Sequence, residues 1–143
     1  MTLSQLFDRS FVQRRNVVGL EWQGRELTFG EIDARANLMA RELVARGLAK
    51  GDRLAVYLVN RLEIVDLFLA CTRLGLIYVP INILYREREV DHILGDAEPR
   101  AVVAVDAPPS TEGVEWWPLD DLVSSASRRM PDPLADAPAL DDD

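Results

Sequence analysis

Apolar positions along this chain follow a helical period in some segments and a strand period in others. Helical spacing predicts helices over residues 3–12, 29–46, 62–74, 86–94 and 119–125. Short runs rich in β-branched and aromatic residues predict strands over residues 17–22, 26–28, 53–59, 77–79 and 101–105. Trp116 and Trp117 indicate one more short strand or edge segment. Secondary structure of both kinds therefore alternates through most of the sequence.

Residues that favour helix ends support this assignment. Thr28 and Glu31 have the spacing of a capping box, in which the two side chains bond each other's backbone N–H groups. Asn60 is a good cap for the helix that follows it. Gly75 suits a left-handed C-cap, and Gly95 is expected to close the helix that begins at residue 86.

Residues 53–105 run in the order strand, helix, strand, helix, strand, which favours parallel strands joined by crossovers. Residues 53–59 are almost continuously apolar, as expected for a strand covered on both faces. Pro80 cannot donate to a sheet ladder, so a buried strand should stop there. Residues 75–82 then lead into a loop at the carboxyl end of the sheet, where open α/β sheets bind ligands. The sequence predicts an α/β fold with a mostly parallel sheet and flanking helices.

Composition describes a globular domain with an acidic end. Hydrophobic residues make up 48% and charged residues 28% of 143 residues, and the net charge is −8. Residues 1–103 carry 14 acidic and 14 basic side chains, so the excess lies in residues 104–143, with 10 acidic side chains against two arginines. This distribution argues against nucleic-acid binding, which needs a basic patch. Residues 126–143 have the Pro, Ala and Asp composition of an acidic linker.

Few side chains here are typical of catalysis. Cys71 is the only cysteine and lies among apolar helical residues, so we interpret it as core filling. His92 is the only histidine, and we expect a partly exposed position on a helix. Lys50 is the only lysine and lies in a loop after a helix. The start lacks the apolar stretch of a secretory signal, and the longest uncharged run, residues 74–85, is too short to span a membrane. We expect a cytoplasmic protein.

Three motifs resemble the amino-terminal part of the adenylate-forming family, which includes acyl-CoA synthetases, peptide-synthetase adenylation domains and luciferases. Residues 27–32, Leu-Thr-Phe-Gly-Glu-Ile, are similar to the family's first core motif. Residues 47–56 resemble its glycine-flanked approach to the first parallel strand. Residues 73–82, Arg-Leu-Gly-Leu-Ile-Tyr-Val-Pro-Ile-Asn, resemble its second core motif. The order and spacing match as well, so the chain resembles a partial N-terminal subdomain of such an enzyme.

Residues 73–82 differ from the second core motif at positions that distinguish peptide-synthetase domains from acyl-CoA synthetases. Peptide-synthetase domains often have Lys-Ala before the glycine and Asp at the end of this motif. Here Arg73 and Leu74 precede Gly75, and Asn82 stands at the end, which is more similar to acyl-CoA synthetases. Residues 85–100 also resemble the malonyl-CoA synthetase type.

The resemblance implies ATP, Mg²⁺ and coenzyme A as cofactors and a small-molecule carboxylate as the substrate of a full-length enzyme. The family holds the ATP phosphates in a Ser/Thr/Gly-rich loop ending in Pro-Lys-Gly, because backbone N–H groups and a cation offset phosphate charge. This sequence contains no such loop. We therefore expect residues 1–125 to be a partial AMP-binding large domain and residues 126–143 to be a linker leading to a missing phosphate loop. No catalytic or metal-binding residue is assigned, cofactor-binding residues stay unknown, and no cofactor is expected to bind this fragment tightly.

Several polar clusters have a plainer interpretation. Glu87, Glu89 and Asp91 alternate with other charges on a helix and are expected to form a solvated face. Arg86 and Arg88 have the charge to meet the phosphates of coenzyme A, but exposed helical arginines are usually only solvated. Tyr78 is expected in the core or the crevice wall. Asp141–Asp143 have the oxygens for a divalent ion, but a terminal acidic run is normally solvated.

The expected function is that of the N-terminal part of an AMP-forming acyl-CoA synthetase, with the fragment alone inactive. Two alternatives stay open: a fragment of a peptide-synthetase adenylation domain, and a non-catalytic α/β module from a truncated gene. Residues of this segment do not identify the acyl group, because specificity pockets of the family come from later segments. Exposed sheet edges make self-association of the isolated chain an expectation.

Overall fold

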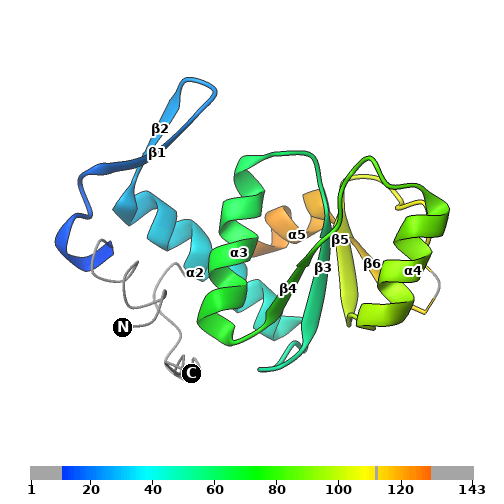
Figure 1. The fold of residues 1–143 in the computed structure, drawn as a ribbon. Helices are drawn as coiled ribbons and strands as arrows, with labels where there is room; N and C mark the ends of the chain where they lie inside the picture. The colour runs from blue at the N-terminus through cyan, green and yellow to red at the C-terminus, as the bar shows by residue number, and fades with distance from the viewer. Residues whose placement is uncertain (1–10, 112, 130–143) are drawn as a thin grey trace.

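The computed structural model describes residues 11–111 and 113–129, and Figure 1 shows their arrangement. A β-hairpin comes first, built from β1 (Val18–Trp22) and β2 (Arg25–Thr28). Gln23 and Gly24 both have positive φ, at 49° and 82°, which gives the tight two-residue turn between the strands. The hairpin extends away from the rest of the molecule (Figure 1). Of the predicted first helix, residues 11–13 are helical, and Leu3, Leu6 and Phe7 lie outside the described residues.

Helix α2 (Phe29–Ala45) begins at the predicted capping box. The Thr28 hydroxyl accepts from the Glu31 N–H at 3.1 Å, and the Glu31 carboxylate accepts from the Thr28 N–H at 3.0 Å. Hydrogen bonding from Thr28 to the Glu31 carboxylate, above all from the Thr28 backbone N–H, lowers the pKa of Glu31, because it favours the charged form. The helix buries a stripe of residues at helical spacing, as its sequence pattern predicts: Ile32, Ala36, Met39, Ala40 and Leu43.

A four-stranded sheet forms the centre, in the order β4-β3-β5-β6, and all its pairings are parallel. Its strands are β3 (Arg53–Tyr57), β4 (Ile77–Pro80), β5 (Ala101–Ala104) and β6 (Glu115–Pro118). Helix α3 (Leu62–Leu74) connects β3 to β4, and α4 (Glu87–Ala97) connects β4 to β5. The short helix α5 (Leu119–Ala126) follows β6. The predicted α/β class with a mostly parallel sheet is confirmed.

Helices cover the two faces of this sheet unequally. One face packs on α2, α3 and α5, with a core that includes Leu43, Leu67 and Leu119, all of them 0% exposed. The other face packs on α4, through Val90 and Leu94 against β3 and β5 (Figure 1). Because the chain leaves β3 toward α3 on one face and reaches β5 through α4 on the other, β3 and β5 are neighbours at a topological switch point.

Three details differ from the sequence prediction. The N-cap of α3 is Arg61 with extended backbone, so Asn60 as cap was wrong. Gly95 lies inside α4, which continues to Ala97 and ends at Glu98 with φ 48°. Strand β4 ends at Pro80 as predicted, but it is an edge strand with Ile77 46% exposed, so describing it as buried was wrong. Proline is tolerated at such an edge because one side of the strand has no ladder to form.

Candidate functional site

Parallel strands all finish at the same end of the sheet, and the loop after β4 lies at this carboxyl end. Tyr57, the last residue of β3, holds this loop: its hydroxyl lies 2.9 Å from the Ile83 carbonyl oxygen and 2.7 Å from that of Tyr85. The Asn82 side-chain oxygen accepts from the Leu84 N–H at 2.9 Å. This rim of the sheet is therefore a fixed turn, and Asn82 is the residue that forms it.

A shallow cavity of about 570 Å³ lies beside the start of α4, next to this loop. It is lined by Tyr85, Arg88, Glu89, His92 and Ile93. His92 is exposed on the helix, as expected. The cavity contains a positively charged side chain, Arg88, and a negatively charged one, Glu89. Arg88 and the imidazole of His92 are its side-chain nitrogen donors.

The acidic residues of α4 act separately. Glu89 accepts from the Arg86 N–H at 3.2 Å and so caps the helix, whereas Asp91 accepts from the Ser110 hydroxyl at 3.1 Å. Glu87 is exposed. Within residues 11–111 and 113–129, no group of three His, Cys, Asp or Glu side chains has the arrangement to hold a metal ion. Asp141–Asp143 lie outside the described residues.

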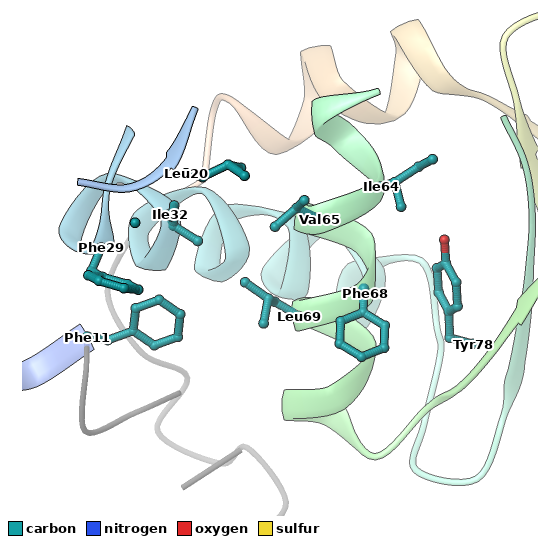
Figure 2. A pocket seen from close by; sticks show the side chains of 10 residues that line it. Phe11, Leu20, Phe29, Ile32, Ile64, Val65, Phe68, Leu69 and Tyr78 are labelled. Atoms are coloured by element: carbon teal, nitrogen blue, oxygen red, sulfur yellow. The ribbon is translucent and has the colours of Figure 1, made fainter. Parts of the chain in front are cut away.

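An apolar groove of about 340 Å³ lies on the other side of the molecule, between the hairpin, α2, α3 and β4 (Figure 2). Its walls carry ten residues: Phe11, Gly19, Leu20, Phe29, Ile32, Ile64, Val65, Phe68, Leu69 and Tyr78. Apart from the Tyr78 hydroxyl, their side chains contain no polar atom. We call this space the apolar groove.

Aromatic rings border both ends of the apolar groove. Phe11 meets Phe29 edge to face with ring centroids 6.0 Å apart, and Phe68 meets Tyr78 in the same way at 5.8 Å. Burial raises the pKa of Tyr78 to about 12, and nearby Cys71 adds to the shift. The Tyr78 phenol therefore stays protonated at neutral pH and forms part of the wall of the apolar groove.

Neither Cys71 nor Lys50 lies at the strand-end rim. Cys71 is 1% exposed in the core, and burial raises the pKa of its thiol to about 12, so it is not a nucleophile at neutral pH. Lys50 precedes β3, and its Cγ would be 2.9 Å from a Cβ built on Gly75, which precedes β4. Since β3 and β4 both begin there, Lys50 lies at the end of the sheet where the strands start, opposite the rim.

Sequence reasoning did not predict the apolar groove. Its residues come from the helical residues 11–13, the hairpin, α2, α3 and β4, and most of them were assigned only to the apolar faces of these elements. The one local signal was the weak polar face of residues 62–71, which left more apolar surface on α3 than one sheet can cover.

The chain belongs to the AMP-binding enzyme family, whose model matches residues 7–140. One similar protein is the long-chain-fatty-acid–CoA ligase FadD13 of Mycobacterium tuberculosis strain H37Rv, 34% identical over 128 residues. Another is CymA of Salinispora arenicola, a probable non-canonical nonribosomal peptide synthetase, 32% identical over 102 residues. These matches cover 80% and 71% of this chain, but only 24% of FadD13 and 1% of CymA. Both relatives are consistent with this family, and the chain spans a minor part of each.

A solved structure shows the same fold. The N-terminal subdomain of NpsA from Klebsiella oxytoca superposes with a TM-score of 0.87 at 22% identity, over 96% of this chain and 36% of that one. The predicted relation to an N-terminal subdomain of adenylate-forming enzymes is confirmed for the fold. None of the helices among the described residues has the length and hydrophobicity to cross a membrane.

Proposed function

We propose that this chain is the N-terminal part of an AMP-forming acyl-CoA synthetase. Such an enzyme joins a carboxylate to ATP, which gives an acyl-adenylate and releases pyrophosphate. The thiol of coenzyme A then attacks the acyl carbon, the bond to AMP breaks, and an acyl-CoA is formed. The observation that carries this proposal is the match to FadD13, which extends over 80% of the chain at 34% identity.

A fragment of a peptide-synthetase adenylation domain is the second candidate, and the match to CymA supports it. Asn82 does not separate the two. Its side-chain oxygen accepts from the Leu84 N–H, and an aspartate carboxylate would accept the same bond. The proposal for the synthetase therefore depends on the extent of the match and not on this residue.

The proposed role of residues 1–125 is structural within a large AMP-binding domain. The described part supplies a sheet and a fixed strand-end rim, but its core thiol and its lysine are remote from that rim. ATP, Mg²⁺ and coenzyme A belong in this proposal to the complete enzyme, which would act in the cytoplasm. Residues 126–143 would serve as its acidic linker.

The first experiment measures ATP–pyrophosphate exchange by the purified 143-residue chain. We expect no exchange above a buffer control with any carboxylate, because the chain lacks a phosphate-binding loop. Turnover at enzyme-like rates would contradict the proposed division of roles. This result is independent of the type of ligase.

The second experiment separates the two candidates and uses the protein expressed with whatever coding sequence continues the reading frame. Fatty and short-chain carboxylates and the amino acids are each supplied with ATP. Acyl thioester formation that requires coenzyme A is the expected result. Adenylation of amino acids without any reaction with coenzyme A would favour the peptide-synthetase alternative, and an immediate stop codon would favour a non-catalytic module.

A further inference from the structure

The Tyr57 side chain links the sheet to the loop after β4. Tyr57 is the last residue of β3 and is only 8% exposed. Its hydroxyl lies within hydrogen-bond distance of two backbone carbonyl oxygens of this loop, those of Ile83 and Tyr85. A phenol has one proton to donate, so the two carbonyls share a single donor. Both contacts therefore depend on one hydroxyl group.

Two further hydrogen bonds of this loop are local. The Tyr85 N–H donates to the Asn82 carbonyl oxygen at 3.0 Å, and the Leu84 N–H donates to the Asn82 side chain at 2.9 Å. These two bonds shape the turn, but they do not join it to the sheet. The Tyr57 hydroxyl makes that connection, and Ile83 adds apolar packing on the same face of the sheet.

Tyr57 stands at the topological switch point of the sheet, where it pairs with Ala104, the last residue of β5. Open α/β sheets bind ligands at the carboxyl ends of the strands, at such a point. The loop that Tyr57 holds carries Tyr85, which is 39% exposed and lines the shallow cavity together with Arg88 and His92. The bond from the Tyr57 hydroxyl thus decides where this aromatic wall of the cavity stands.

We propose that Tyr57 is a positioning residue of the strand-end rim. Its hydroxyl holds the loop so that Tyr85 lies against the shallow cavity, and this sets how tightly the complete enzyme binds the substrate at this end of the sheet. Tyr57 acts on that substrate only through the loop, because its hydroxyl is engaged by two backbone carbonyls. The effect on the substrate rests on the proposed ligase function, whereas the effect on the loop does not.

Backbone ¹⁵N relaxation of the 143-residue chain tests the effect on the loop. Tyr57→Phe keeps the ring and its packing and removes only the hydroxyl. We expect the order parameters of the Leu84 and Tyr85 amides to fall from about 0.85 to about 0.6, while those of β5 stay unchanged. Because order parameters report fast motion of the folded state, a general loss of stability does not imitate this result.

Tyr78→Phe is the matched control, since it removes a phenolic hydroxyl from the neighbouring strand β4. The Tyr78 ring meets Phe68 of α3, on the other face of the sheet from the loop contact (Figure 2). This variant should leave the order parameters of the loop unchanged. A loop that stays as rigid in Tyr57→Phe as in the wild-type chain would overturn the proposal.

Steady-state kinetics test the effect on the substrate, with the protein expressed with whatever coding sequence continues the reading frame. KM is measured separately for ATP, the carboxylate and coenzyme A. Tyr57→Phe should raise one of these KM values about fivefold, the factor that corresponds to one ordinary hydrogen bond, and leave kcat within about twofold. Three unchanged KM values, or a fall in kcat alone, would overturn the proposal. If the wild-type protein forms neither adenylate nor thioester, the proposed function is wrong, and the loop measurement alone decides the positioning role.

Discussion

Gly75 shows how one residue joins two elements of this fold. It ends α3 in the left-handed conformation, with φ 70° and ψ 26°, and the next N–H, of Leu76, returns to the Cys71 carbonyl at 2.9 Å. A Cβ at this position would also stand 2.9 Å from Cγ of Lys50. Both the backbone conformation and the space available therefore favour glycine.

The two effects can be separated by comparison with Gly24. We expect Gly75→Ala to cost about 2 kcal/mol, of which about 1 kcal/mol comes from the positive φ and the remainder from contact with Lys50. Gly24 has φ 82° and no heavy atom within 4 Å of its added Cβ, so Gly24→Ala should cost only about 1 kcal/mol. Urea unfolding measures both costs.

Lys50→Ala completes a double-mutant cycle. In the Gly75→Ala background, Lys50→Ala should restore the part of the free energy of unfolding by which Gly75→Ala costs more than Gly24→Ala. The effect of Lys50→Ala alone is subtracted first. Equal costs at Gly24 and Gly75 would show that the Lys50 side chain moves aside without penalty.

Between elements, α2 and α3 are joined by charged groups as well as by apolar packing. The Arg35 guanidinium donates two bonds to Asp66, at 3.0 and 2.7 Å, and Asp66 is 5% exposed. Arg73 donates to the Asn37 side chain at 2.7 Å and to the Asp33 carboxylate at 2.8 Å. Burial still raises the pKa of Asp66, against the effect of Arg35, so the pair is costly to desolvate.

Breaking the Arg35–Asp66 pair should cost more than replacing it. We expect Asp66→Ala to lower the free energy of unfolding by about 3 kcal/mol, because it leaves the Arg35 charge partly buried without its partner. Arg35→Met/Asp66→Leu, which replaces both charges with apolar groups, should recover most of this loss. Thermal or urea unfolding of both variants tests this, and a double variant as unstable as Asp66→Ala would show that the ion pair itself stabilises the fold.

The elements were largely predictable because their signals are local. The capping box at Thr28 and Glu31, the left-handed Gly75 and the end of β4 at Pro80 each involve residues close in sequence. Gly95 was misread because glycine is permissive and can also lie inside a helix. Strand order was not predicted, because nothing local shows that β4 pairs on one side only. The apolar groove was missed for the same reason, since its walls meet only in the folded chain.

At the scale of the molecule, the sheet has an edge that the described residues do not cover. Strand β4 pairs with β3 on one side, and Ile77 at its start is 46% exposed. An exposed edge with an apolar side chain is a surface on which strands of other molecules can pair. We therefore expect the 143-residue chain to self-associate as its concentration rises.

Ile77→Lys should weaken this self-association by about tenfold, because it removes an apolar contact and places a charge on the edge strand. Val123→Lys is the matched control: Val123 is 38% exposed but lies on helix α5 and not on strand β4. Both substitutions change the net charge equally, so a general effect of charge would appear in both. Sedimentation velocity at increasing protein concentration measures the association. If the two variants associate equally, the β4 edge is not the contact surface, because only Ile77→Lys alters it.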